Sequence, residues 1–171
     1  ADAIVQTARR TLERAVNWVE REVSGAEVIY GDTDSLFVRL PGRSKEQAFE
    51  EGARIAREVT RSNPRPVELQ FDKVYLPCCL VSKKRYVGHA WTPGDAAPVF
   101  DAKGIETVRR DQCAATQRLL RGALETLFRS GGDLSPVKRY LQQHAARMRA
   151  GRFSLQDFVF HHEVRPPDEY R

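Results

Sequence analysis

The sequence predicts an α+β fold, in which an antiparallel sheet with packed helices is followed by a mostly helical portion. Short β-prone runs separated by turn-forming residues extend from about residue 27 to residue 105, with one helical pattern crossing them. After Arg110 the apolar residues change to helical spacing. The length of 171 residues and the hydrophobic share of 41% suit one ordinary globular domain.

The first elements follow from the spacing of apolar residues. Over residues 4–23 they recur at steps of three and four, and arginine and glutamate fill much of the rest, which predicts an amphipathic helix. The β-prone runs 27–30 and 35–38 flank a cluster of turn formers and predict a hairpin with an acidic tip. Ser44 and Gln47 have the spacing of a capping box, so a second helix is expected to follow.

The second helix is expected to end at residues 63–66, which read Asn-Pro-Arg-Pro. Residues 67–72 alternate between apolar and polar side chains, the period of a half-buried strand. Residues 74–81 and 85–90 continue in an extended style. The sequence therefore predicts that the chain returns from the helix to the β layer.

The last third of the chain is predicted to be helical. Apolar residues at helical spacing mark a helix around residues 119–128, which two glycines at 131 and 132 are expected to close. Ser135 and Pro136 then predict the start of another helix, with Gly151 as its end.

Composition excludes two classes of protein. No run of eighteen apolar residues and no charged-then-apolar leader is present, so neither a membrane span nor a secretory signal is predicted. Cys78 and Cys79 are neighbours and Cys113 stands alone, which makes a poor disulfide framework. We expect a soluble, intracellular chain. Because it begins with alanine inside a helical pattern, we also expect a segment of a longer polypeptide.

Charge is distributed unevenly along the chain. Residues 1–72 hold 11 Lys and Arg against 13 Asp and Glu, whereas residues 73–171 hold 17 against 10. A basic second half suggests a surface for a polyanion, of which nucleic acid is the usual example. A solvated basic face is the alternative interpretation.

The acidic turn at residues 30–35, Tyr-Gly-Asp-Thr-Asp-Ser, is the most informative part of the sequence. A tight turn projects the carboxylates of Asp32 and Asp34 into one small volume, where they repel each other unless cations neutralise them. Two Mg²⁺ ions about 4 Å apart can hold the attacking and leaving oxygens of phosphoryl transfer. The alternative is that these residues are only good turn formers.

Three motifs in order resemble those of family B DNA polymerases. The first is the acidic turn followed by Leu-Phe-Val, which resembles the third catalytic motif of that family. The second is Lys-Lys-Arg-Tyr at residues 83–86, and the third is Asp-Ala-Lys-Gly-Ile-Glu at residues 101–106, which continues into Val-Arg-Arg-Asp. The resemblance covers essentially the whole chain, and within the family it is strongest to the zeta branch, with the delta branch next.

The resemblance implies a fold and an activity. Residues 1–110 would form the C-terminal part of a palm with its antiparallel sheet, and residues 111–171 the start of a thumb. Asp32 and Asp34 would be catalytic and would bind metal, with Asp34 as the main ligand. Two Mg²⁺ ions would be completed by an upstream aspartate that this chain lacks. The reaction would be nucleotidyl transfer from a dNTP to a primer 3′-OH, and the segment alone is expected to be inactive.

The basic motifs would contact primer–template DNA. The resemblance assigns the second motif to the minor groove, where every Watson–Crick pair offers an acceptor at a similar position. The third motif would hold primer phosphates, with a glycine leaving room for a backbone to come near. The predicted DNA-binding residues are Lys83, Lys84, Arg85, Tyr86, Lys103, Gly104, Arg109 and Arg110. The acidic Asp101, Glu106 and Asp111 either orient these cations through ion pairs or cap the next helix.

Partners and location also follow from the resemblance. It implies incoming dNTP, the remainder of the polymerase chain, a HORMA-type adaptor and accessory polymerase subunits, with translesion synthesis and DNA repair in the nucleus. The alternatives are a replicative delta-type segment and a non-catalytic palm and thumb module that only binds DNA. A metal-dependent nuclease would share the two-ion chemistry, but it would not account for the second and third motifs.

Overall fold

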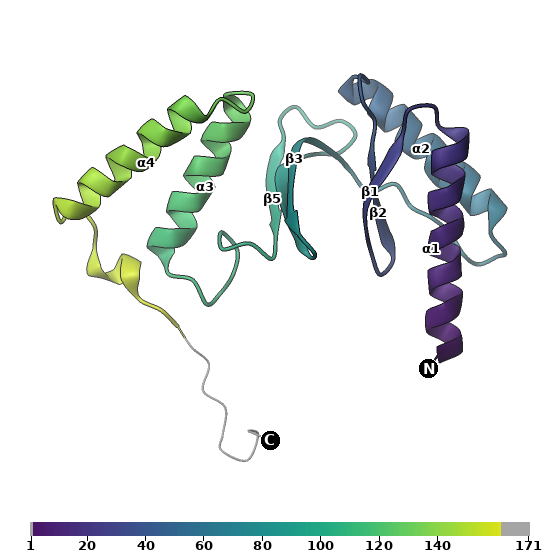
Figure 1. The fold of residues 1–171 in the computed structure, drawn as a ribbon, viewed down its shortest axis with the longest axis horizontal. Coiled ribbons are helices and arrows are strands. Elements are labelled where there is room, and N and C mark those ends of the chain that lie inside the picture. The colour runs from purple at the N-terminus through teal and green to yellow at the C-terminus, as the bar shows by residue number, and fades with distance from the viewer. Residues whose placement is uncertain (1, 162–171) are drawn as a thin grey trace, which may run out of the picture. The chain divides into compact units, whose positions relative to one another are not determined.

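A computed structural model describes residues 2–161 of the chain (Figure 1). The elements follow in the order α1 (Asp2–Glu22), β1 (Glu27–Asp32), β2 (Ser35–Arg39), α2 (Lys45–Ser62), β3 (Val74–Ser82), β4 (Arg85–Trp91), β5 (Val99–Lys103), α3 (Ala114–Arg129), α4 (Leu134–Arg149) and the 3₁₀-helix η1 (Leu155–Phe158). Helices combined with antiparallel strands confirm the α+β class.

The chain divides into two compact units that interleave along the sequence. The first unit comprises Ala1–Leu76 and Ala90–Pro98, and the second comprises Pro77–His89 and Val99–Arg171. The predicted boundary between palm and thumb at Arg110 concerns the division of a complete polymerase, and it stays a prediction.

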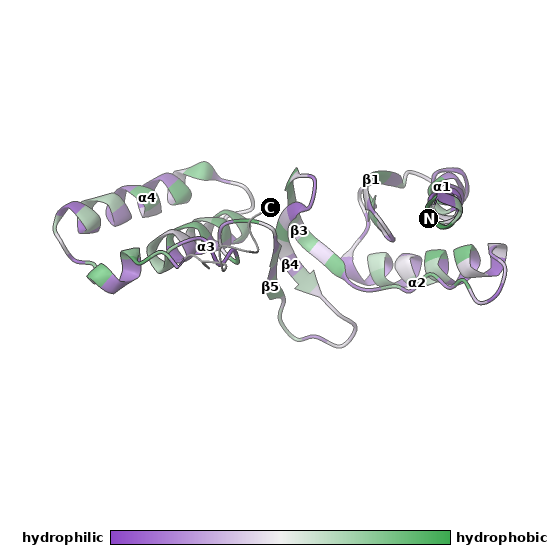
Figure 2. Cartoon of the chain, turned by 90° about the horizontal axis from the view of Figure 1, so that it is seen from below, coloured by the Kyte–Doolittle hydropathy of each residue, from purple (hydrophilic) through white to green (hydrophobic). Residues whose placement is uncertain are grey.

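The core of the first unit lies between α1, α2 and the β1–β2 hairpin. Val19 of α1 and Val59 of α2 are almost completely buried, at 0% and 1% exposed. Figure 2 shows apolar and polar residues alternating along α2, as expected for a helix with one buried face. The hairpin contributes side chains from one face only, namely Val28, Leu36 and Val38. This core holds the acidic hairpin against the two helices.

The capping box predicted at the start of α2 is confirmed. The Ser44 hydroxyl accepts a hydrogen bond from the Gln47 backbone N–H at 3.2 Å, and the Gln47 side chain accepts one from the Ser44 N–H at 2.9 Å. The predicted end is confirmed as well, because α2 stops at Ser62 with Asn63 as its C-cap.

Replacing Ser44 with alanine should lower the free energy of unfolding by about 1 kcal/mol, because the Gln47 N–H loses its acceptor. Chemical denaturation followed by circular dichroism measures this change. Ser44→Asp is the control, since a carboxylate keeps the acceptor and should leave stability close to that of the native sequence. Equal stability of the alanine variant and the native chain would contradict the role of the cap.

The prediction of a strand over residues 67–72 is wrong. This segment belongs to neither sheet, since the sheets have the orders β1-β2 and β3-β4-β5. The backbone of Leu69 instead exchanges two hydrogen bonds with the Thr60 hydroxyl, at 2.8 and 3.2 Å. Phe71 packs edge-on against Phe49. The alternation therefore reflects packing on α2, and the expected single β layer is two separate sheets.

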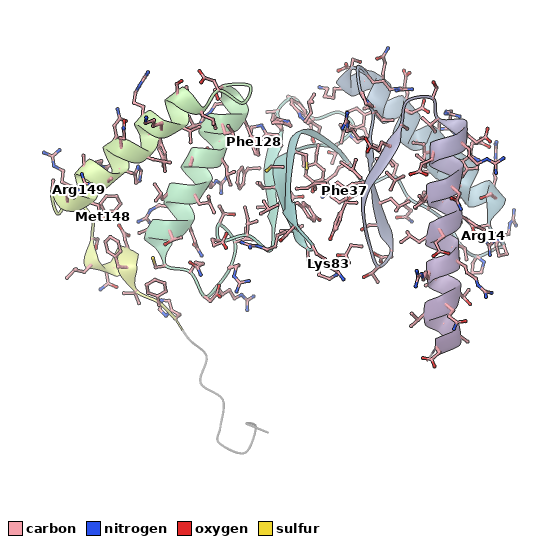
Figure 3. All side chains as sticks on the ribbon, in the orientation of Figure 1. Arg14, Phe37, Lys83, Phe128, Met148 and Arg149 are labelled. Carbon is pink, nitrogen blue, oxygen red and sulfur yellow. The ribbon has the colours of Figure 1, made fainter. Side chains whose placement is uncertain are left out.

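The second unit has its own core between strands and α3. Val87, Ala102 and Ile105 are buried there, and Leu124 and Phe128 of α3 pack against them (Figure 3). The helix α4 begins one residue earlier than predicted, at Leu134, because the Asp133 carboxylate caps it by accepting from the Ser135 N–H at 2.8 Å. Among residues 2–161, no helix is long and apolar enough to cross a membrane.

Candidate metal-binding and nucleic-acid-binding residues

The acidic turn is tighter than its sequence predicts. β1 extends to Asp32 and β2 begins at Ser35, so the hairpin loop consists of Thr33 and Asp34 alone. The side chain of Asp34 lies in the exposed loop, whereas Asp32 is half-buried as the last residue of its strand. The structure therefore brings the two predicted metal ligands together at one hairpin tip.

A β-bulge in β1 decides the face on which Asp32 lies. Val28 pairs with Val38 and Tyr30 pairs with Phe37, so Ile29 is an extra residue on the β1 side. Side chains alternate along a strand, and one extra residue moves every following side chain to the other face. Without the bulge, Asp32 would share the face of Val28, which packs in the helical core.

Gly31 confirms this change of face. An ideal Cβ on Gly31 would lie 3.3 Å from Leu36 Cδ2 and 3.9 Å from Leu12 Cδ2, so the core face of the hairpin continues through position 31. Asp32, the next residue, consequently points to the opposite face with Tyr30. Sequence analysis missed the bulge, because neither a glycine nor a break in the apolar pattern marks Ile29.

Hydrogen bonds within the turn hold the main chain and side chain of Asp32. Its carbonyl oxygen accepts from the Asp34 N–H at 2.5 Å and from the Ser35 hydroxyl at 3.1 Å. The Thr33 hydroxyl donates to Asp32 Oδ1 at 3.2 Å. Thr33 has a φ of 50°, which is strained for a β-branched residue. Strain of this kind persists where the surrounding structure holds it, and it is common at functional sites.

Aromatic rings cover the face of the hairpin that carries Tyr30. The rings of Tyr30 and Phe37 are 5.6 Å apart, and Phe37 stacks on Tyr75 of β3 at 5.6 Å and 17°. Figure 3 labels Phe37 within this group of side chains. The ammonium of Lys73 lies 6.0 Å from the centre of the Tyr75 ring. Asp32 therefore lies on the same face of the hairpin as a layer of packed rings that sequence analysis did not predict.

The chemistry of the acidic tip fits a hard divalent cation. Asp32 and Asp34 supply carboxylate oxygens, which Mg²⁺ prefers, and Mg²⁺ sites commonly use one or two carboxylates with water and substrate phosphate. Within the described part of the chain, no three His, Cys, Asp or Glu side chains form a group that could hold a metal. Asp32 and Asp34 could therefore supply only part of the coordination shell of such a cation.

The second motif lies at another hairpin. β3 ends at Ser82 and β4 begins at Arg85, so Lys83 and Lys84 form a two-residue loop (Figure 3). Both lysines are exposed, and Lys84 has a φ of 61°. Among residues 2–161, Thr33 and Lys84 are the only residues other than glycine with positive φ. The two strained turns thus coincide with the two predicted functional hairpins.

The third motif packs directly against this basic turn. Gly104 has a φ of +66°, and a Cβ placed on it would lie only 2.2 Å from the Lys84 carbonyl oxygen. The backbone that Gly104 accommodates is thus the chain's own. The Arg85 Nε donates to the Gly104 carbonyl at 3.3 Å, and its guanidinium forms an ion pair with Glu106.

The other two acidic residues of this segment, Asp101 and Asp111, form ion pairs with its own cations. Asp111 accepts from the Arg109 guanidinium at 2.5 and 2.9 Å, and Asp101 lies 3.5 Å from the Lys103 ammonium. The bond from Arg109 lowers the pKa of the Asp111 carboxyl. Asp111 does not cap the next helix, because the N-cap residue of α3 is Cys113. Of the two roles left open by the sequence, the ion pairs are the one observed.

The remaining predicted DNA-binding residues lie on the same two segments. Tyr86 is half-buried in β4, one residue before the buried Val87. Arg110 is exposed in the loop before α3, and the Gln117 side chain holds that loop by donating to the Arg109 carbonyl at 2.8 Å.

The comparisons with known proteins agree on one family. A model described as DNA polymerase family B matches residues 1–171. The DNA polymerase zeta catalytic subunit of Mus musculus is 52% identical over 172 residues, which are 99% of this chain and 6% of that protein. The zeta catalytic subunit of Saccharomyces cerevisiae is 50% identical over 167 residues, 96% of this chain and 11% of that protein. The delta catalytic subunit of Candida albicans is 33% identical over 166 residues, 93% of this chain and 16% of that protein.

The chain thus spans less than a fifth of the length of each of these relatives. Similarity is greater to the zeta catalytic subunits than to the delta subunit, as the second and third motifs predict. The resemblance inferred from three ordered motifs is confirmed along the full sequence, and the chain belongs to DNA polymerase family B.

Proposed function

We propose that this chain is the palm-to-thumb segment of a DNA-directed DNA polymerase, with the end of the palm in residues 1–110 and the start of the thumb in residues 111–171. The reaction is transfer of a nucleotide from a dNTP to a primer 3′-OH. The observation that carries the proposal is the pair of carboxylates at the hairpin tip of a family B chain, where a β-bulge turns Asp32 away from the core. A surface that only bound DNA would gain nothing from two anions at such a tip.

Asp34 is the main metal ligand in this proposal, and Asp32 has an accessory role. The exposed loop position leaves the Asp34 carboxylate accessible to solvent and to a metal ion. The hydrogen bond from Thr33 orients one oxygen of Asp32. Two bound Mg²⁺ ions, completed by an upstream aspartate, would lower the pKa of the primer hydroxyl and stabilise the charge on the leaving pyrophosphate.

The two basic motifs hold primer–template DNA. Lys83 and Lys84 reach the minor groove from their exposed turn, and Tyr86 supports them from β4. Lys103, Arg109 and Arg110, with Gly104 among them, lie in the segment that binds the primer backbone. The bidentate pair with Asp111 keeps the Arg109 guanidinium in one orientation, which suits a charge that must meet a phosphate at a fixed position.

The cellular role we propose is translesion synthesis in DNA repair, in the nucleus, with a HORMA-type adaptor and accessory polymerase subunits as partners. The zeta catalytic subunits support this choice, since six of them are 46–52% identical to the chain. A replicative delta-type role is the second candidate, and it has weaker support, because delta catalytic subunits from Candida albicans and Glycine max are 33% and 37% identical.

Primer extension by the complete polymerase that contains this segment tests the proposal. We expect a recessed primer to lengthen only when dNTPs and Mg²⁺ are both present, and chelation of the metal by EDTA should stop the reaction. A nuclease would shorten the primer without dNTPs. A non-catalytic module would retard the DNA in a gel and leave the primer unchanged, and either result would contradict the proposal.

A further inference from the structure

We infer that Arg85 and Glu106 form a brace that positions the Lys83–Lys84 turn for DNA, so that Arg85 is a positioning residue and not a DNA contact. The inference rests on the proposed function for the identity of the ligand, which is duplex DNA with a recessed primer. It assigns a role to Glu106, and it replaces the DNA contact that the sequence predicts for Arg85.

The turn needs support because its backbone is strained. Lys84 has a φ of 61°, in the left-handed region that is unfavourable for a residue with a Cβ. A two-residue loop has no further residues over which to distribute this strain. Unless other parts of the fold hold it, the turn would relax, and the two lysine side chains would then leave their positions.

The support comes from the third motif. The Lys84 carbonyl oxygen lies where a Cβ on Gly104 would be, so the two backbones are in direct contact. In the next residue, Arg85, Nε donates a hydrogen bond to the Gly104 carbonyl oxygen, and a terminal guanidinium nitrogen forms an ion pair with the Glu106 carboxylate. These two bonds engage one edge of the guanidinium fork, and they hold the first residue of β4 to the segment at residues 104–106.

Both ends of the brace are anchored in the core of the second unit. Ile105 lies between the two acceptors of Arg85 and is 3% exposed. Val87 follows Arg85 by two residues and is 0% exposed. The two side chains belong to one buried cluster with Ala102. Packed side chains therefore fix the segments that carry Arg85 and Glu106. The brace between these two residues then holds the neighbouring Lys84 in place.

The charge of Glu106 makes the inference testable by the sign of an effect. A carboxylate near a DNA-binding surface repels phosphates, so its neutralisation alone should strengthen DNA binding. A hydrogen bond from its own backbone N–H, together with the charges of Arg85 and Arg109, lowers the pKa of the Glu106 carboxyl, so it stays ionised at neutral pH. If Glu106 braces the turn, neutralisation should weaken binding instead.

The experiment compares Glu106→Gln, Arg85→Gln and the double variant in the complete polymerase, with a recessed primer–template as the probe. We expect each single variant to raise KM for primer–template by about tenfold, equivalent to about 1.4 kcal/mol, with kcat at saturating DNA changed by less than about twofold. The double variant should raise KM no more than either single variant does, because each single substitution already removes the same interaction. Arg85→Lys keeps the positive charge but lacks the two parallel N–H donors of the guanidinium. Its KM should therefore stay raised above that of the native enzyme.

Three results would overturn the brace. The first is tighter DNA binding by Glu106→Gln, and the second is a loss of DNA affinity in the double variant that equals the sum of the two single losses. The third concerns Arg85→Gln: if the slope of log K against log salt concentration becomes shallower by about one, this variant has lost a phosphate contact. Glu58→Gln is the matched control, since Glu58 pairs with Arg61 at 2.7 Å within α2, outside both motifs, and should leave KM unchanged. Melting temperatures of all variants separate loss of the turn from loss of the fold.

A second pair of substitutions separates this inference from the proposed function. If Lys83→Ala with Lys84→Ala leaves primer–template affinity unchanged, the proposed DNA contact of the turn is wrong, and the brace falls with it. If the lysine variant binds weakly while Glu106→Gln binds normally, only the brace is wrong. Should Glu106→Gln melt below the assay temperature, Glu106→Asp replaces it, and an unchanged KM for that shorter carboxylate would likewise contradict the two-point geometry.

Discussion

Replacing Asp34 with alanine should reduce primer extension by the complete polymerase at least about 10³-fold, because the proposed main metal ligand is lost and a bound ion supplies several kcal/mol of charge stabilisation. Asp34 lies in an exposed loop and holds no part of the core, so the fold should survive. The affinity for primer–template should stay close to that of the native enzyme. Asp32→Ala should have a smaller effect, since the role we propose for Asp32 is accessory.

Single-turnover extension with a saturating primer–template measures this effect, and fluorescence anisotropy measures the DNA affinity separately. Asp95→Asn is the control, because Asp95 accepts hydrogen bonds from Thr92 in a loop outside the motifs, and its loss should leave extension unchanged. Extension at the native rate by the Asp34 variant would defeat the assignment of the acidic tip as the metal site.

Gly104→Ala should have the second largest effect, and it should act on both stability and DNA binding. The new Cβ would meet the Lys84 carbonyl oxygen at 2.2 Å, a backbone atom that cannot swing away. Overpacking of this kind costs about 1 to 3 kcal/mol, and the positive φ adds about 1 kcal/mol or more. Movement of the Lys84 backbone should raise KM for primer–template together with the loss of stability.

Gly131→Ala is a closely matched control for this substitution. Gly131 has a φ of +63°, close to the +66° of Gly104, but a Cβ placed on it would have no neighbouring atom within 4 Å. It therefore measures the cost of the backbone conformation without the steric clash. Thermal denaturation of the two variants should show a larger fall for Gly104→Ala, and hydrogen exchange should show faster opening of residues 83–86. Equal falls in melting temperature for the two variants would mean that the contact between the two motifs contributes nothing to stability.

The sequence predicted most of the elements because their signals are local. The helix α1, the capping box at Ser44 and the end of α2 at Asn63 depend on residues three or four positions apart. The prediction of a strand over residues 67–72 was wrong although its signal is also local, because alternation describes any segment with one buried face. Whether such a segment joins a sheet depends on a partner strand, and Thr60 supplies its hydrogen bonds instead.

The candidate site divides in the same way. Asp32, Asp34 and the basic residues of both later motifs could be named from residue type and spacing alone. The bulge at Ile29 could not, because strand register is decided by pairing with β2. The contact of Gly104 with Lys84 and the pair between Arg85 and Glu106 could not be foreseen either, since these residues are about twenty positions apart.

By itself, the sequence determined the family, the order of helices and strands, and the side chains that carry charge at the two turns, because motif identity and periodicity are properties of neighbouring residues. Only the tertiary structure decided which face of the hairpin bears Asp32 and what holds the Lys83–Lys84 turn in place. Those outcomes depend on register and on close backbone contact, which arise when segments distant in the chain pack together and bury their apolar side chains.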